Sequence, residues 1–384
     1  MKTAPLGEVA QIVSGATPKT GVDEYWDGDV QWATPADLSK LAGQYISRTP
    51  RTLTAAGVRS CATTVLPKGS VLLSSRAPIG HVAINAVPMA TNQGFKSLVP
   101  GPSLDAKFLY FWLRSKTSYL QSLGNGATFK ELSKKTTANI QIPLPSLSEQ
   151  RRIVAILDHA DALRAKRRQA LAHLDTLTQS IFHAMFGNPL HNDRNLPRAA
   201  LGSVAEVVTG SSPPRSDPAN FGNSIEWIKS DNLGGDVAST AHEWLSEEGR
   251  AKARVAPAGS TLVTCIAGSP TSIGKASMVD RAVAFNQQIN AILPSMKIDA
   301  TFLLGQLKTA PDLVRAKSTG GMKGLVNKSA FQSIEVLLPE LDFQREFAQR
   351  IGSVSNLRSS MRPALEAEEQ LFTSLQSRAF SGRL

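Results

Sequence analysis

The chain has 384 residues, of which 42% are hydrophobic, a size that allows about two or three domains with cores of their own. Its 42 lysine and arginine residues exceed its 31 aspartate and glutamate residues by 11, which fits a polyanionic partner as well as a merely basic soluble protein. Two widely separated cysteines argue against a disulfide framework or a cysteine-based zinc site. Without an apolar run of about 18 residues or an apolar leader, we expect a cytoplasmic protein with no membrane partner.

The sequence contains an internal repeat. LGEVAQIVSGATP at 6–18 returns as LGSVAEVVTGSSP at 201–213, an offset of 195. Later blocks return at offsets of 190 and 194, among them APIGHVAI at 77–84, which corresponds to TSIGKASM at 271–278. An ordered series of offsets with short insertions between the blocks is typical of a duplication whose loops have diverged. We therefore expect two copies of one domain.

The first part of each copy, residues 1–145 and 188–340, mixes short β-type runs such as VLLSS and NAILP with glycine, proline and serine. One predicted helix, DAKFLYFWLRSKTSYLQSL, stands out in the first copy. This pattern predicts an α+β fold with two mixed α/β domains. The first domain carries 15 basic and 8 acidic side chains and the second 15 and 14, so only the first has a strong electrostatic attraction to a polyanion.

Each copy ends in a long predicted helix, at 146–187 and at 341–384. In the first helix, Ser146 precedes Glu149 by three residues, the spacing of a capping box, and Gly187 supplies an end signal. Positions spaced by sevens are mainly apolar in both helices, which predicts that they pack on each other as an antiparallel coiled coil. The predicted seam and partner-binding positions are Ile153, Ile156, Leu163, Arg167, Leu174, Ile181, Phe347, Val354, Leu357, Glu368 and Leu371.

Two charged residues, Arg167 and Glu368, occupy the main rows of this seam. Because their charges are opposite, we expect them to pair and to fix the register of the helices. Pro363 should kink or interrupt the second helix, because proline cannot donate the helical backbone hydrogen bond. The basic run at 164–168 is expected to be mostly a solvated helix face, with contact to nucleic acid or a partner as the alternative.

Sequence signals for catalysis are weak. TCIAGSPTSIGKAS at 264–277 resembles a phosphate-binding loop, but five residues rather than four separate its glycines, and Ala276 replaces the serine or threonine that would bind magnesium. FGNPL at 186–190 is similar to part of an adenine methyltransferase motif but is explained by helix termination. We expect no catalytic, cofactor or metal site in this chain; an NTPase that uses Lys275 is the enzymatic rival.

Small polar loops and Asn-Gln pairs instead suggest binding to nucleic acid. Amide side chains can read adenine in the major groove, although the two asparagines would serve equally well in turns, and lysines in glycine-rich loops can contact phosphates. Trp32 and Trp227 are expected in the core rather than stacked on bases. The candidate DNA-binding residues are Thr17, Lys19, Thr34, Arg76, His81, Asn92, Gln93, Lys96, Thr128, Lys130, Lys134, Ser211, Arg215, Lys229, Ser269, Thr271, Lys275, Asn286, Gln287, Lys323 and Lys328.

The duplicated openings, the IG and NQ blocks and the segment IPLPSLSEQRRIVAILD before a long helix resemble the specificity subunit of type I restriction-modification systems over essentially the whole chain. The second copy, LLPELDFQREFAQRI, departs by having Phe343 in place of Glu149. The resemblance implies two target-recognition domains that each read one half of a bipartite site in double-stranded DNA, and helices that set the spacing. It also implies two methyltransferase subunits with S-adenosylmethionine, and restriction or translocase subunits with ATP and magnesium, as partners.

Two further points follow from the repeat. The second copy has a longer loop, AGSPTS, before the IG block, which makes this loop a candidate for the difference between the two half-sites that are read. The alternative function is a two-headed assembly or scaffold protein that binds proteins rather than DNA. Such a protein would show little salt-dependent affinity for duplex DNA.

Overall fold

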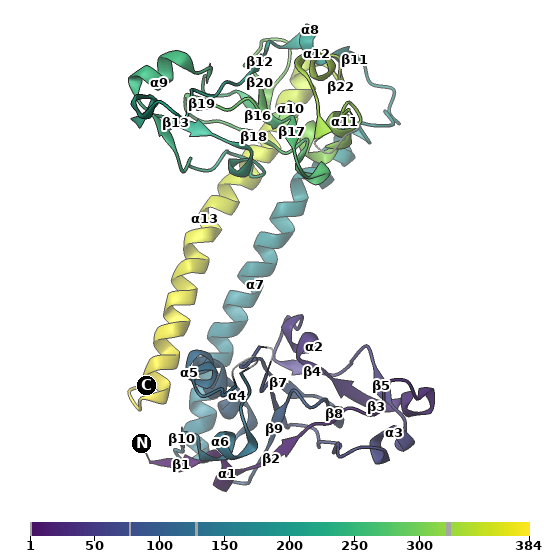
Figure 1. Ribbon diagram of the computed structural model, residues 1–384, viewed down its shortest axis with the longest axis vertical. Helices are drawn as coiled ribbons and strands as arrows, with labels where there is room; N and C mark the ends of the chain where they lie inside the picture. Colours follow the sequence, from purple (N-terminus) through teal and green to yellow (C-terminus); the bar gives the residue numbers. More distant parts are fainter. Residues whose placement is uncertain (1, 77, 127–129, 320–323) are drawn as a thin grey trace. The chain divides into compact units, whose positions relative to one another are not determined.

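The chain forms two compact units, which Figure 1 shows with their helices and strands. Unit 1 consists of Met1–Arg168 together with Ala364–Leu384, and unit 2 consists of Gln169–Pro363. Each of the two long helices therefore contributes one part to each unit. The computed structural model describes all residues except 1, 77, 127–129 and 320–323.

The part of unit 1 that precedes the first long helix, called domain 1, is built on a mixed sheet and a smaller sheet. Strands of the larger sheet, in spatial order, are β2 (Ala10–Ser14), β9 (Lys96–Pro100), β6 (Val71–Leu73), β7 (Val82–Asn85) and β4 (Tyr45–Ile46). The smaller sheet consists of β5 (Thr52–Leu53), β3 (Trp26–Ala33) and β8 (Met89–Thr91). A separate antiparallel ribbon joins β1 (Thr3–Pro5) to β10 (Gln141–Pro143).

Helix α4 (Ala106–Ser115) carries much of the core of unit 1. Asp105 caps its first turn by accepting hydrogen bonds from the backbone N–H groups of Lys107 and Phe108, at 2.9 and 3.0 Å. Its residues 108 to 113 are all buried, because the helix packs between the sheet and the long helices. The shorter helices are α1 (Leu6–Val9), η1 (Asp23–Tyr25), α2 (Pro35–Ser39), α3 (Ala55–Arg59), α5 (Thr117–Ser122) and α6 (Lys134–Asn139).

The corresponding part of unit 2, called domain 2 and lying between the long helices in sequence, has two four-stranded sheets and two ribbons. The first sheet contains β12 (Val207–Thr209), β20 (Ile289–Ile292), β16 (Thr261–Thr264) and β18 (Ala276–Met278). The second contains β14 (Trp244–Leu245), β13 (Phe221–Ile228), β19 (Val283–Phe285) and β15 (Val255–Ala256). The ribbons pair β11 (Arg198–Ala200) with β22 (Glu335–Leu337), and β17 (Ile266–Ala267) with β21 (Gly324–Leu325).

Helix α10 (Ala300–Thr309) is the counterpart of α4 and is capped in the same way by Asp299. The shorter helices of domain 2 are α8 (Leu201–Val204), η2 (Pro218–Asn220), η3 (Ser230–Asn232), α9 (Glu247–Lys252), η4 (Pro270–Ser272), α11 (Asp312–Arg315) and α12 (Lys328–Gln332).

Topology confirms the internal repeat. The pairs β1–β10 and β11–β22 are both antiparallel, whereas β3–β8 and β13–β19 are both parallel. The register of β3 shifts between Trp26 and Val30, and that of β13 shifts between Phe221 and Ile225. Trp32 and Trp227 lie at equivalent positions, and both are 3% exposed, as expected for core residues. The two domains therefore share the same central strand pairing, and they differ in their loops and in short edge strands such as β4, β15 and the β17–β21 ribbon.

Helix α7 (Leu147–Phe186) begins after Ser146, whose hydroxyl accepts a hydrogen bond from the N–H of Glu149 at 3.3 Å. The predicted capping box is only half present, because the Glu149 carboxylate binds Arg152 instead of the cap backbone. Gly187 ends the helix with a φ of 74°. This geometry explains FGNPL structurally, since Phe186 is fully buried in the core.

Helix α13 (Leu341–Phe380) is one continuous α-helix that contains Pro363. The expected interruption at this proline is therefore wrong. Val354 before the proline and Phe372 after it are both buried, so tertiary packing on each side holds the helix together despite the missing hydrogen bond.

The two long helices run antiparallel in each unit. In unit 1, Arg167 of α7 binds Glu368 of α13, and Arg152 donates to the backbone carbonyl of Leu384. In unit 2, the ring of Phe182 lies 5.4 Å from that of Phe347. Increasing residue numbers on α7 thus pair with decreasing numbers on α13, which confirms the antiparallel packing expected from the sequence.

The predicted seam is buried along one row and open along the other. Ile153, Leu174, Phe347 and Val354 are buried, and Arg167, Ile181 and Glu368 are half-buried. The other row is more open: Ile156 is half-buried, and the exposed residues are Leu163, Leu357 and Leu371. Each long helix turns part of its apolar surface toward α4 or α10 instead, which leaves the second row only partly covered.

Two glutamines at equivalent positions fasten α7 and α13 to the domains. The fully buried Gln150 side chain accepts from the N–H of Asp105 at 2.8 Å and donates to the carbonyls of Ser103 and Pro145. The Gln344 side chain accepts the equivalent hydrogen bond from the N–H of Asp299 at 2.9 Å. Each glutamine therefore fixes the start of a long helix to the start of α4 or α10.

Candidate nucleic-acid interface

Exposed lysines lie at the loops of domain 1. Lys19, Lys130 and Lys134 are all exposed, and none of them has an ion-pair partner within the part of the chain that the structure describes. Lys134 is the first residue of α6, and its counterpart Lys328 is the first residue of α12 and is also exposed. These ammonium groups can approach a phosphate without first breaking a contact in the protein.

Lys96 lies in a different environment from these lysines. Its side chain is 9% exposed, and its ammonium group lies 3.0 Å from a carboxylate oxygen of Glu131. The half-buried Arg76 forms a backbone bridge to the same Glu131. Lys96 therefore holds Glu131 to the sheet, and it could reach a phosphate only after losing this partly buried ion pair.

Thr34 and His81 are both partly covered. The Thr34 hydroxyl donates to the Asp37 carboxylate at 2.7 Å and thereby belongs to the cap of α2. His81 lines a polar hollow of about 260 Å³ together with Arg114 and Arg168. Asp161 lies in the same lining at 4.0 Å from Arg114, and Arg168 binds Glu369, so acidic partners partly neutralise both guanidinium groups.

The Asn-Gln pairs separate into two roles. Asn92 accepts a hydrogen bond from the N–H of Gly94 at 2.9 Å, and Asn286 accepts one from the N–H of Gln288 at 3.2 Å. Both asparagine side chains are therefore used inside turns, the second of the two alternatives left open by the sequence. Gln93 and Gln287 are exposed and pair with the hydroxyls of Thr17 and Ser212.

The basic candidates of domain 2 are partly neutralised. Glu243 binds both Lys229, at 2.5 Å, and Arg215, at 3.0 Å. The hydrogen bond from Lys229, with that from Arg215, holds the pKa of the Glu243 carboxyl below its ordinary value. The Lys229 ammonium also lies 4.8 Å from the centre of the Trp227 ring. Ser211 accepts a hydrogen bond from the N–H of Arg254, so it too serves the local fold.

The loop between β17 and β18 is not a phosphate-binding loop of an NTPase. Its glycine-lysine pair leads directly into strand β18 instead of a helix, and η4 is only three residues long. Ser269 and Thr271 are exposed and hydrogen-bonded to each other, and Lys275 is exposed. Arg315 donates to the carbonyls of Thr271 and Ile273, which anchors the loop to α11.

Two candidates, Thr128 and Lys323, lie outside the described residues. Among those that are described, no three His, Cys, Asp or Glu side chains come together as metal ligands would. Burial raises the pKa of the Cys265 thiol to about 12, which makes it a poor nucleophile. In the same part of the chain, no helix combines the length and the apolar character needed to cross a bilayer.

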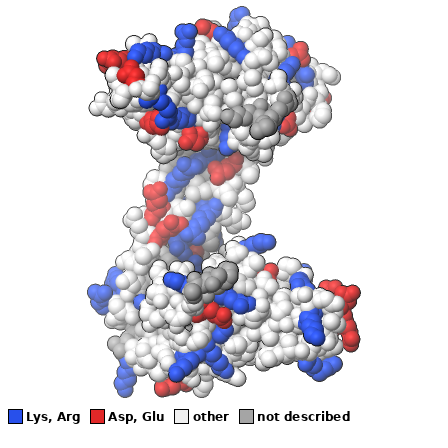
Figure 2. Space-filling view, in the orientation of Figure 1, with Lys and Arg blue, Asp and Glu red and all other residues white. Residues whose placement is uncertain are grey.

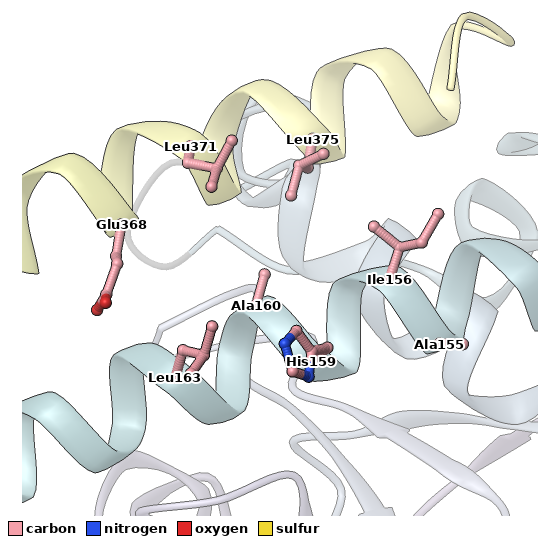
Figure 3. A pocket seen from close by; sticks show the side chains of 8 residues that line it. All are labelled: Ala155, Ile156, His159, Ala160, Leu163, Glu368, Leu371 and Leu375. Atoms are coloured by element: carbon pink, nitrogen blue, oxygen red, sulfur yellow. The ribbon is translucent and has the colours of Figure 1, made fainter.

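An apolar groove follows the helix pair of unit 1. Figure 3 shows the side chains of Leu371 and Leu375 on α13 opposite Ala160 and Leu163 on α7. The groove has a volume of about 410 Å³, and Leu163 and Leu371 are 45% and 55% exposed. Ile156 and His159 complete the α7 side. An exposed apolar strip of this kind on a helix pair is suited to receive another helix.

The basic run on α7 is largely used within unit 1. Arg167 and Arg168 bind Glu368 and Glu369 on α13, at 2.7 and 2.6 Å. The buried Arg164 guanidinium lies 3.6 Å from the centre of the Phe372 ring. Figure 2 accordingly shows basic and acidic side chains interleaved on the helices. The expected solvated face holds for Lys166 and Arg168, which are exposed, whereas Arg167 is half-buried and Arg164 is buried beneath Phe372 of α13.

Sequence patterns did not reveal the polar contacts that hold each domain on the helices. In unit 2, Asp236 binds Lys308 of α10 and Arg358 of α13, and Arg358 also donates to the carbonyl of Leu174 on α7. In unit 1, the Gln44 side chain of the equivalent loop donates a hydrogen bond of 3.0 Å to the Asp158 carboxylate of α7. The only signal in the sequence was the equivalent position of the two loops in the repeat.

Comparison with known proteins identifies relatives of the whole chain. The profile of the type I restriction modification DNA specificity domain matches residues 1–173 and 198–367. The MjaIX specificity subunit of Methanocaldococcus jannaschii is 32% identical over 259 residues, which are 63% of this chain. The chain spans 60% of the length of that relative. The MjaVIII specificity subunit of the same organism is 22% identical over 99% of this chain and 92% of its own length.

Solved structures show the same fold. A chain in a structure of a type I R-M system matches with a TM-score of 0.63 and 19% identity, covering 100% of this chain and 98% of that one. The S subunit from M. genitalium matches with a TM-score of 0.60 and 13% identity, covering 99% and 96%. With the family profile matched over both copies of the repeat, the chain belongs to the family of type I restriction-modification DNA specificity domains.

Proposed function

We propose that this protein is the specificity subunit of a type I restriction-modification complex and that it binds double-stranded DNA in a sequence-specific manner. Domain 1 and domain 2 each read one half of a bipartite site, and the length of the helix pair sets the spacing of the halves. The chain itself contributes binding rather than bond-breaking chemistry. S-adenosylmethionine, ATP and magnesium are bound by the partner subunits.

The repeat carries this proposal. Two domains with the same central strand pairing but different loops are suited to read two different sequences, and the loop that carries η4 is longer in the sequence than its counterpart in domain 1. Exposed lysines at the loops, such as Lys19 and Lys275, supply contacts to phosphates that orient each domain on the duplex.

The apolar groove of unit 1 provides a docking surface for a methyltransferase subunit. Two helices leave Leu163 and Leu371 exposed, and a helix from a partner would cover both. In a complex that methylates two half-sites, two such subunits are needed. The restriction or translocase subunits then assemble on the methyltransferase core.

The proposal is tested by co-expressing the chain with its methyltransferase subunit and mapping methylated adenines across the host genome. The expected result is a motif of two short specific sequences with a constant unspecified spacer. Leu163→Asp combined with Leu371→Asp should abolish both methylation and co-purification of the methyltransferase subunit. The matched control is Leu190→Asp, since Leu190 is similarly exposed but lies outside the groove. Methylation without a bipartite motif would contradict the proposal.

A further inference from the structure

The two domains share one loop-and-turn element in close detail. In domain 1, a Cβ atom on Gly15 would lie 2.0 Å from the backbone oxygen of Asn92. In domain 2, a Cβ atom on Gly210 would lie 2.1 Å from the backbone oxygen of Asn286. Only glycine permits this approach, so the loop after β2 or β12 is pressed against the Asn-Gln turn in both domains.

The backbone of this element is held by the same hydrogen bonds in both copies. The N–H of Ala16 donates to the carbonyl of Thr91 at 3.0 Å, and that of Ser211 donates to Phe285 at 3.1 Å. The indole N–H of Trp32 donates to the Ala16 carbonyl at 3.1 Å, and that of Trp227 to the Ser211 carbonyl at 3.4 Å. In each domain, a buried tryptophan thus holds the loop backbone through its indole N–H.

Each element presents one exposed glutamine. The hydroxyl of Thr17 donates to the Oε1 atom of Gln93, and the hydroxyl of Ser212 donates to the Oε1 atom of Gln287. In both domains the hydroxyl engages the oxygen of the amide, so this oxygen is used within the protein. Within the described residues, neither Nε2 atom has an acceptor, so each glutamine keeps its N–H groups for an external acceptor.

The surroundings of the two glutamines differ. Lys96 of β9 corresponds to Asn290 of β20; Lys96 binds Glu131, whereas Asn290 binds Thr209. Near domain 2's element, Arg215 is paired with Glu243, whereas the exposed Lys19 of domain 1 has no ion-pair partner among described residues. Two domains that differ in this way would read different bases. The loop-and-turn element that they share is therefore suited to contact a chemical group that is present in both half-sites.

We infer that Gln93 and Gln287 each donate a hydrogen bond to a backbone phosphate of the DNA, in the same position relative to their domain, and do not read a base. The inference rests on the proposed function. A phosphate oxygen only accepts, it is present in every sequence, and an amide held by a rigid turn meets it without further ordering. The pair would set the orientation of each domain, while the loops that differ supply the sequence preference.

The test measures binding of the full chain, in complex with its methyltransferase subunits, to duplexes that contain the mapped bipartite site or a scrambled version. Gln93→Ala and Gln287→Ala should each weaken binding about tenfold on both duplexes, so that the preference for the correct site is unchanged. Because glutamine is neutral, the salt dependence of binding should also be unchanged. Gln11→Ala is the matched control, since Gln11 is an exposed glutamine on β2 outside the element.

A second measurement locates the contact. In a duplex with one neutral methylphosphonate, the loss caused by Gln93→Ala should largely disappear at one position in the first half-site, and that of Gln287→Ala at one position in the second. Relaxed preference for one base in either variant, or affinity equal to the wild type, would overturn the inference alone. A wild-type complex that binds no duplex would overturn the proposed function as well.

Discussion

The guanidinium group of Arg167 on α7 donates two hydrogen bonds to the Oε1 atom of Glu368 on α13, from Nε at 3.0 Å and from Nη2 at 2.7 Å. These residues are the charged members of the main heptad rows, and their pairing was predicted from the sequence. The hydrogen bond from Arg167 lowers the pKa of the Glu368 carboxyl below its ordinary value. The pair therefore joins the two antiparallel helices of unit 1 at one position, and we expect it to fix their register.

Exchanging these charges tests that register. Glu368→Arg alone should lower the melting temperature of the protein, because two guanidinium groups would then face each other on the helix pair. The double variant Arg167→Glu with Glu368→Arg should recover most of the loss. Thermal unfolding at low and high salt measures the effect, and a double variant no more stable than the single one would show that the pair does not specify the register.

Shortening the helix pair tests whether its length sets the spacing of the half-sites. Removal of 167–173 from α7 and 363–369 from α13 takes out one heptad each, together with both partners of the Arg167–Glu368 and Arg168–Glu369 pairs. Each helix becomes about 10.5 Å shorter, which corresponds to about three base pairs. We expect the spacer of the methylated motif to change or methylation to cease.

The exchanged pair Arg167→Glu with Glu368→Arg is the control of unchanged length, and its spacer should be that of the wild type. If the shortened protein methylated the same motif with the same spacer, the helices would not act as a ruler.

The close packing of Gly15 and Gly210 against the Asn-Gln turns can be tested by measuring the free energy of unfolding of variants. Gly15→Ala and Gly210→Ala should each destabilise the protein by about 3 kcal/mol, because the new methyl group collides with backbone atoms of the Asn-Gln turn. Gly21→Ala is the matched control: a Cβ there meets nothing within 4 Å, and a change of less than about 0.5 kcal/mol is expected. Urea unfolding provides the measurement, and tolerance of both substitutions would contradict the described contact.

The sequence predicted what depends on local period and on repetition. Heptad spacing located the buried row with Ile153 and Phe347, and the repeat predicted two domains of one fold. It missed Phe372, which is buried although it lies outside the heptad rows, because α4 covers that face of α13. Burial against an element distant in sequence leaves no periodic signal in the helix itself.

Side-chain partners were the least predictable part of the candidate site. Lys96 looked like the other lysines of domain 1 until the fold placed it against Glu131, 35 residues later. The role of Gln150 was equally hidden, since its partners are backbone groups of another segment. In both residues the type of side chain allowed several roles, and only the tertiary fold selected one.

The ion pairs of Asp236 predict a dependence of stability on pH. Burial alone would raise the pKa of this carboxyl, but Lys308 and Arg358 more than offset it, so the pKa lies below the ordinary value of 3.8. The stabilisation is therefore complete above that ordinary value and is lost as the pH falls through the lowered pKa. Asp236→Asn should cost about 1–2 kcal/mol at pH 7, allowing for partial solvent screening, and much less near pH 3.

Chemical unfolding of the wild type and the variant at several pH values checks this expectation. Asp342→Asn is the control, because Asp342 is 94% exposed and, among the residues that the structure describes, its ion-pair partner is Arg345 of its own helix, so its effect should be small at every pH. If the free energies of unfolding of the wild type and Asp236→Asn differed by the same amount down to pH 3, the carboxylate would not be the cause of the difference.

Three lysines of domain 1 separate binding to phosphates from support of the fold. Lys19→Ala and Lys130→Ala should each weaken binding to any duplex and reduce the slope of log affinity against log salt by about 1, because each exposed ammonium group would release a counterion from the DNA. Lys96→Met should leave that slope unchanged but lower the unfolding midpoint, because Glu131 loses its partner. Binding titrations at several salt concentrations, with unfolding curves, measure both. A reduced slope for Lys96→Met would mean that its ion pair opens when DNA binds.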